Sequence, residues 1–155
     1  MWWRSTARMS RRKVPGEAVP AVPPESIGYQ VGPGADLHGA NLAGTNLAGA
    51  NLHGANLNKA RLYMANLAGA NLSEARLIEA DLTRANLRGA DLRKIEQHFA
   101  VRVNFSGANL SGANLSGTTL TQPNFEGADL TGADLSEVEF WTANLTGAKL
   151  IEANL

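Results

Sequence analysis

The sequence contains no cysteine, so disulfide bonds, thiolate metal sites and a cysteine nucleophile are all excluded. It has 14 basic and 14 acidic residues and no net charge, which gives no overall attraction for nucleic acid or an anionic membrane. No apolar run approaches the roughly 18 residues of a membrane-spanning helix, so we expect no transmembrane segment. A chain of 155 residues has the length of a single domain.

Aromatic residues are also scarce, at 6%, and the apolar content comes mainly from alanine and leucine, which indicates a repeat. A central Leu or Phe recurs every five residues from Leu37 to Leu92, and again from Phe105 to Leu155. Ala lies two places before the centre in 18 of the 23 repeats, and Asn or Asp lies immediately before it in 18. Gly lies two places after the centre at 12 of 22 positions. This regularity makes the period of five itself a structural signal.

A period of five fits neither regular secondary structure. On an α-helix the central residues would drift around the axis, and on one flat strand they would alternate between its faces. The period suits a chain that turns a corner once per repeat, with Leu and the small residue two places before it on the inside. Asn, Asp and Gly would supply the corners, by adopting left-handed backbone conformations and by local side-chain hydrogen bonds.

The sequence "ANLAGTNLAGANLHGANL" at 40–57 closely resembles the pentapeptide-repeat family, whose motif is A-(D/N)-L-x-x. The resemblance covers residues 35–155 and implies an all-β fold, a right-handed quadrilateral β-helix with four repeats per coil. Twenty-three repeats on four sides make 23/4, or about 5.75, coils. Phe105 and Phe125, one coil apart, should then touch inside the tube. Four oppositely charged pairs have the matching spacing of twenty residues: Lys59–Glu79, Arg61–Asp81, Glu74–Lys94 and Asp129–Lys149.

Residues 1–34 lack the repeat. The first 13 residues carry five basic side chains and no acidic one, and a proline-rich stretch follows, so we expect a mostly disordered tail. Residues 26–34 are a possible cap for the first coil. We expect a cytoplasmic protein. An N-terminal targeting segment remains an alternative, although no apolar stretch follows Arg11-Arg12 as a twin-arginine signal requires, and a start at Met9 is another.

The repeat is interrupted at 93–104, between a first block over 35–94 and a second over 103–155, with 95–102 irregular. This stretch is either a structural bridge, with Ile95, Phe99 or Val101 filling the seam, or a loop that contacts a partner. Trp141 is the large outward aromatic residue of the second block. The candidate partner-contact residues are Arg93, Lys94, Glu96, Gln97, His98, Phe99, Arg102 and Trp141.

Catalytic, cofactor-binding and metal-binding residues are not indicated, because no acid–base pair, nucleophile with its base, or ligand cluster is recognisable. We therefore expect a non-catalytic interaction or scaffold module with a protein partner.

Some family members mimic duplex DNA and bind DNA gyrase, and this function is an alternative. However, only residues 103–155 are acidic, with six acidic residues and one basic. A purely structural role is a third possibility. Direct nucleic-acid binding is not expected, and the open last coil could form a homodimer.

Overall fold

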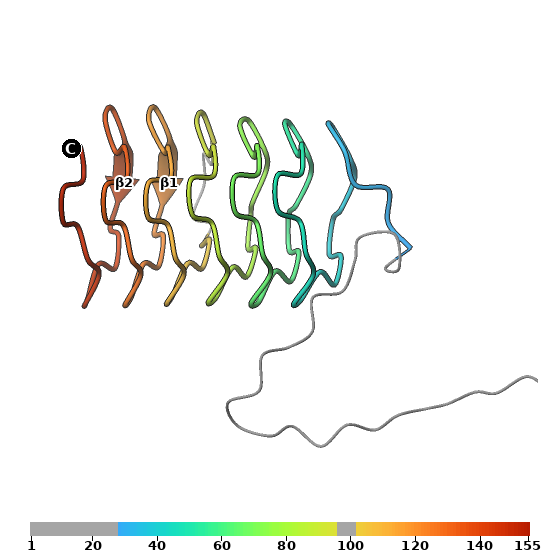
Figure 1. Cartoon of the computed structure of the whole chain (residues 1–155), viewed down its shortest axis with the longest axis horizontal. Helices are drawn as coiled ribbons and strands as arrows, with labels where there is room; N and C mark the ends of the chain where they lie inside the picture. Colours follow the sequence, from blue (N-terminus) through green and yellow to red (C-terminus); the bar gives the residue numbers. More distant parts are fainter. Residues whose placement is uncertain (1–27, 96–101) are drawn as a thin grey trace, which may run out of the picture.

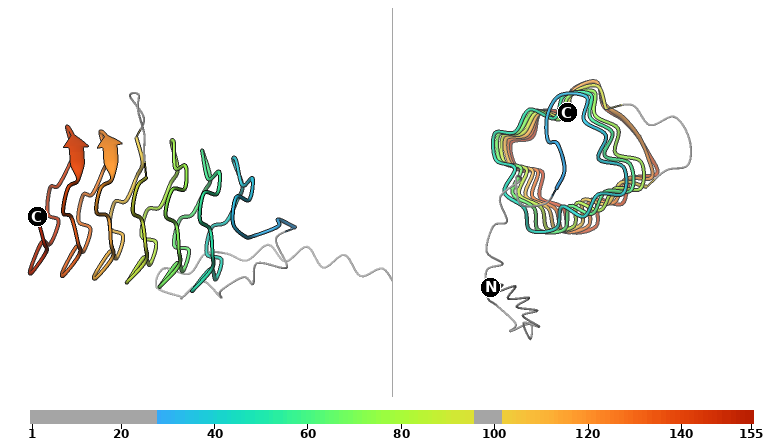
Figure 2. Two further views of the ribbon diagram at one scale, coloured as in Figure 1. Left: turned by 90° about the horizontal axis from the view of Figure 1, so that it is seen from above. Right: turned by 90° about the vertical axis from the view of Figure 1, so that its right-hand side faces the viewer.

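The chain forms a rod in which the backbone winds repeatedly around one axis (Figure 1). The structure, a computed structural model, describes residues 28–95 and 102–155. Viewed along the axis, successive coils lie over one another and share one four-sided outline (Figure 2). The predicted right-handed quadrilateral β-helix is confirmed, and the described residues contain no helix.

Parallel β-bridges set the length of a coil. Asp36 pairs with Asn56, and Asn56 in turn pairs with Arg76, at the predicted spacing of twenty residues. Three bridges span the interruption and join residues 23 apart: Asp81↔Asn104, Asn86↔Asn109 and Asp91↔Asn114. The coil with the interruption is therefore three residues longer than the others, while the sides on which these bridges lie stay in register.

Two of the predicted charge pairs come within ion-pair distance. Lys59 Nζ lies 3.8 Å from a Glu79 carboxylate oxygen, and Lys94 Nζ lies 4.0 Å from Glu74. The other two pairs, Arg61–Asp81 and Asp129–Lys149, are bridge partners in neighbouring coils. All four side chains of the two ion pairs are more than half exposed, so each pair contributes well under about 1 kcal/mol.

The central residues fill the tube. Every central Leu from Leu37 to Leu92 is at most 1% exposed, and Phe105 and Phe125 are equally buried. The small residue two places before the centre is also inside, as at Ala55 and Ala80. Burying a Leu side chain contributes about 1.5–3 kcal/mol, so the buried Leu side chains together dominate the stability of the rod.

Each corner contains a residue in the left-handed backbone conformation two places after the centre. Gly69 takes this position with φ of +65°, and elsewhere side chains are strained into it, as at Met64 with φ of 56°. The backbone N–H of the next residue usually bonds back to the central carbonyl, as from Ala40 to Leu37 at 3.0 Å. This is the pattern of a type II turn. Asn and Asp do not supply the left-handed corners, contrary to our expectation.

Asn and Asp instead hold the corner through their side chains. Asn41 Oδ1 accepts a hydrogen bond from the backbone N–H of Ala43, and most repeats have the same bond. Asn side chains also bond from coil to coil, as from Asn66 Nδ2 to Asn46 Oδ1 and from Asn86 Nδ2 to Asn66 Oδ1, both at 3.0 Å. The amide thus satisfies a backbone donor in its own repeat and fixes the register to the next coil.

At the interruption the regular path continues to Ile95 and resumes by Arg102. Ile95 is 1% exposed and occupies the inward small-residue position, as the interpretation of this stretch as a structural bridge requires. Phe99 and Val101, the other two residues considered for that role, lie outside the described residues. Val103 is buried in the corresponding position of the next side.

Two short strands, β1 (Thr119–Thr121) and β2 (Glu139–Trp141), pair in parallel in adjacent coils (Figure 1). They lie on the side of the rod whose centres are Leu37, Leu57, Leu77, Leu120 and Phe140, which we call the strand face. Inside the tube, the rings of Phe105 and Phe125 stack with centroids 4.9 Å apart and planes 2° apart, as predicted. The Phe140 ring adds a tilted contact to Phe125, with centroids 5.2 Å apart.

The two ends of the rod differ. The first described residues lie across the end of the first coil (Figure 2), where Val31 packs against the core. At the other end Leu145 and Leu150 are 40% and 37% exposed. A cap over 26–34, a disordered tail over 1–34 and association through the last coil stay predictions.

Candidate functional site

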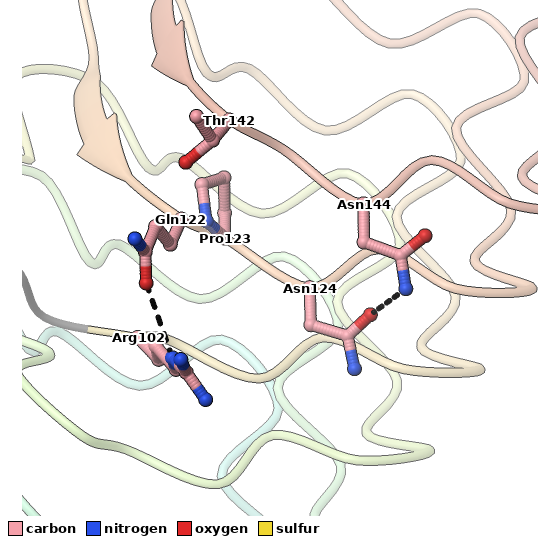
Figure 3. Close-up of a pocket in the computed structure, with 6 residues that line it drawn as sticks. All are labelled: Arg102, Gln122, Pro123, Asn124, Thr142 and Asn144. Carbon is pink, nitrogen blue, oxygen red and sulfur yellow. Dashed lines mark hydrogen bonds between the residues drawn. The ribbon is translucent and has the colours of Figure 1, made fainter.

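A groove lies at the corner where the strand face meets the next side of the rod. It has a volume of about 430 Å³ and is shown in Figure 3. The residues that line it come from three successive coils and are Arg102, Gln122, Pro123, Asn124, Thr142 and Asn144. Arg102, Gln122 and Thr142 are spaced by twenty residues, so they form one column at the corner.

Pro123 changes the hydrogen bonding of this corner. It occupies the inward position, where other repeats return a backbone N–H to the central carbonyl, and proline has no N–H to donate. The corner after Leu120 therefore lacks the usual turn bond, although Gln122 keeps the left-handed conformation of the other corners, with φ of 52°. As in most repeats, the left-handed residue bonds to the next coil: Gln122 donates its N–H to the Trp141 carbonyl oxygen at 2.7 Å, which ties the corner to β2.

One wall of the groove is a ladder of asparagine side chains. Asn144 Nδ2 donates to Asn124 Oδ1 at 3.0 Å (Figure 3), and Asn124 Nδ2 donates to Asn104 Oδ1 at 3.2 Å. Each oxygen also accepts a backbone N–H, for example from Glu126 to Asn124 at 3.1 Å. Because the oxygens face backbone donors, the orientation of each amide group is determined by the fold.

Arg102 supplies the charge of the groove. Its Nε donates to Gln122 Oε1 at 3.2 Å (Figure 3). It is the last basic residue before Lys149 in the sequence, and the groove lining contains no carboxylate. The groove is therefore a local positive site on the acidic half of the rod.

Trp141 lies beside this groove. It follows Phe140 on β2, precedes the lining residue Thr142, and pairs in register with Thr121 of β1. Its side chain points away from the core and is 62% exposed. An exposed tryptophan next to a polar groove is a typical anchor for protein binding.

Arg93 and Lys94 lie at the opposite edge of the strand face and do not join the groove. Arg93 forms two hydrogen bonds to Asp91, from Nε at 2.9 Å and from a terminal nitrogen at 2.7 Å. This hydrogen bonding by the guanidinium lowers the pKa of Asp91 below its usual value. Lys94 faces Glu74, so the charges of both basic residues are balanced within the rod.

His53 belongs to the same edge and has two neighbours in the next coil, of which only Ser73 lies at the coil spacing of twenty residues. Its Nδ1 lies 3.0 Å from Ser73 Oγ, and its Nε2 lies 3.9 Å from Glu74. Glu74 is 21 residues away, one more than the coil length, so the spacing of the repeats does not predict this contact. Residues 28–95 and 102–155 contain no group of three or more side chains suited to a metal ion.

The structure therefore divides the predicted contact residues. It places Arg102 and Trp141 around one groove and Arg93 and Lys94 at the other edge. The remaining four, Glu96, Gln97, His98 and Phe99, lie outside the described residues and stay a prediction. No helix in the described part of the chain is long and apolar enough to span a membrane.

Sequence comparison identifies the repeat. A family model described as "Pentapeptide repeats" matches in eight copies, over residues 35–73, 60–95, 101–136 and 124–155. No curated protein sequence matches the chain significantly.

Several solved structures are similar. HetL, a pentapeptide repeat protein involved in heterocyst differentiation regulation from the cyanobacterium Nostoc, is 29% identical, with 79% of this chain and 71% of HetL covered and a TM-score of 0.41. A pentapeptide repeat protein from the Arabidopsis thaliana thylakoid lumen is 31% identical, with 77% and 68% covered and a TM-score of 0.47. QnrB1, a plasmid-mediated fluoroquinolone resistance protein, is 21% identical, with 79% and 66% covered and a TM-score of 0.51. The likeness to QnrB1 concerns the fold alone.

Proposed function

The chain belongs to the pentapeptide-repeat family, and from this premise we propose that it is a scaffold that binds a protein partner on the strand face of its second half. The observation that carries the proposal is Trp141, which is 62% exposed beside the Arg102 groove. A large aromatic side chain held outward by a filled β-helix loses little conformational freedom on binding.

The rest of the rod supports a binding role more than a chemical one. Its interior is occupied by buried Leu, Ala and Phe side chains, and the described groove is lined by one arginine, three amides, a proline and a threonine. Such a lining supplies hydrogen bonds and one charge but no acid–base pair. A rigid rod presenting an aromatic anchor and a polar groove is suited to recognition.

Ile151 offers a matched control for testing the proposal. It is also 62% exposed, but it belongs to another side of the rod. A photo-crosslinking residue replacing Thr142 would capture the partner from the organism's own lysate, for identification by mass spectrometry. We expect Trp141→Ala to abolish this crosslink and Ile151→Ala to leave it unchanged. Capture of the same protein with undiminished yield by Trp141→Ala would contradict the proposal.

The acidic surface of the second block favours one alternative, a mimic of duplex DNA that binds gyrase. Residues 103–155 carry six acidic residues and one basic, whereas the basic residues of the first block oppose this role. A supercoiling assay tests it: inhibition by the wild type that is lost when Glu126, Glu137 and Glu139 are changed to Gln would favour mimicry. No inhibition at micromolar protein would exclude it.

A further inference from the structure

The Arg102 groove has a donor pattern that specifies the chemistry of the partner. We infer that it binds the carboxylate of an aspartate or glutamate in the partner, with a neighbouring apolar residue of the partner on Trp141. This inference rests on the proposed function and adds to it the kind of segment that is recognised.

The first part of the pattern is the guanidinium of Arg102. Gln122 Oε1 already accepts from its Nε at 3.2 Å. That contact orients the planar group, and its two terminal nitrogens have no hydrogen-bond partner within residues 28–95 and 102–155, so their edge is available to a ligand. Two parallel N–H groups on this edge match the two oxygens of a carboxylate.

The second part is the orientation of the amides. Gln122 uses its oxygen on Arg102, so its NH₂ group remains as a donor. Asn144 directs its oxygen to the Thr146 N–H at 3.1 Å and one N–H to Asn124 at 3.0 Å, which leaves its second N–H. Each lining amide oxygen thus already accepts a hydrogen bond within the protein, and the N–H groups of Gln122 and Asn144 that remain are donors.

The charge of the surroundings decides between kinds of anion. One guanidinium with neutral amides balances a single negative charge. Residues 103–155 carry six acidic side chains against Lys149 alone, which disfavours a doubly charged phosphate. A volume of about 430 Å³ accommodates a side chain with part of its backbone, and the lining residue Thr142 directly follows Trp141 in the chain. An acidic residue next to an apolar one fits both features.

Nuclear magnetic resonance on the isotope-labelled full chain tests this inference. The probe is the blocked peptide acetyl-Leu-Asp-Leu-amide, whose only charge is the aspartate, and acetyl-Leu-Asn-Leu-amide is its neutral match. We expect the aspartate peptide to shift the side-chain signals of Arg102, Gln122 and Asn144 saturably. Loss of a charged hydrogen-bond partner weakens binding by roughly tenfold or more, so the neutral peptide and Arg102→Gln should each lower affinity by that factor.

Controls separate the outcomes. Arg88→Gln removes an exposed arginine on another side and should leave the affinity unchanged, while Arg102→Lys, which keeps the charge but loses the fork, should give an intermediate value. No shift at the groove, equal binding of both peptides, or stronger competition by inorganic phosphate than by the aspartate peptide would overturn the inference. If Trp141→Ala abolishes partner capture and Arg102→Gln does not, the inference fails while the proposed function stands.

Discussion

The side-chain oxygen of Asn58 accepts a hydrogen bond from the backbone N–H of Ile78, one coil further along the rod, at 2.8 Å. In most repeats this N–H bonds to the Asn or Asp two places before it, as Ala43 does to Asn41. Arg76 occupies that place here and has no acceptor. Asn58, only 7% exposed, supplies the missing oxygen from the neighbouring coil.

We therefore predict that Asn58→Ala lowers the free energy of unfolding by about 1–2 kcal/mol, because it leaves a partly buried N–H without an acceptor. Chemical denaturation monitored by circular dichroism measures the change. In an Arg76→Asn background the local acceptor is restored, and the same substitution should cost less than half as much. His38→Ala, at the equivalent exposed position one coil earlier, is the control. If Asn58→Ala lowered the free energy of unfolding equally in the wild type and in Arg76→Asn, the two asparagines would not be alternative acceptors for the Ile78 N–H.

Thr118 has a comparable role at the seam. Its hydroxyl is fully buried and donates to the Leu92 carbonyl oxygen at 2.9 Å, 26 residues away. We expect Thr118→Val to cost about 1–3 kcal/mol, because the buried carbonyl loses that donor.

Thr45→Val provides the matched control for Thr118. The Thr45 hydroxyl donates to the Leu42 carbonyl oxygen, but that oxygen also accepts the Thr45 backbone N–H at 3.2 Å. Its loss should therefore cost clearly less in thermal or chemical unfolding. Similar losses at the two positions would show that the shape of the side chain, and not its hydroxyl, matters at the seam.

The stacked phenylalanine rings should couple energetically. Phe125 lies between Phe105 and Phe140, with ring centroids 4.9 and 5.2 Å away. We predict a coupling of about 0.5–1.5 kcal/mol between Phe105→Leu and Phe125→Leu in a double-mutant cycle. Leu is the usual central residue of the repeat, so both variants should fold. Simple additivity of the two losses would mean that the rings contribute only their buried area.

Acid should destabilise the rod through its outward aspartates. Hydrogen bonding from Arg93 lowers the pKa of Asp91, and the side chains of Thr131 and Ser136 do the same for Asp129 and Asp134. A carboxyl whose pKa is lower when folded stabilises the protein above its unfolded pKa of about 3.9. That contribution is lost as the pH falls from there through the lower folded value.

Asparagine tests this pH dependence, because it is the usual residue at these positions and can accept the same backbone hydrogen bond without titrating. We expect Asp129→Asn/Asp134→Asn to melt at a temperature close to the wild type at pH 7. Between pH 4 and pH 2.5 its melting temperature should fall less than that of the wild type. Parallel melting curves of the two proteins across that range would contradict the role of these carboxylates.

Part of this structure could be predicted from local pattern. The strict period placed the Leu column and the Ala positions inside, and the spacing of charges favoured four sides. It also brought Phe105 against Phe125, because each repeat meets the same environment one coil later. The corner chemistry was predicted only in part. Glycine is favoured in the left-handed conformation, but several long side chains take that position, because the coil above and the coil below fix the backbone there.

The sequence by itself determined the rod, since burial of one Leu per repeat dominates its stability and recurs at a fixed interval. The tertiary structure alone decided how the irregular positions are satisfied. The interrupted coil is three residues longer than the others, so the contact between Thr118 and Leu92 follows no regular spacing. The Lys94–Glu74 pair followed from the spacing of twenty, but the fold alone brought Arg102 and Trp141 to one corner and held Arg93 on Asp91 at the other edge. Such groupings depend on which corners meet across coils, and no local pattern in the chain records that.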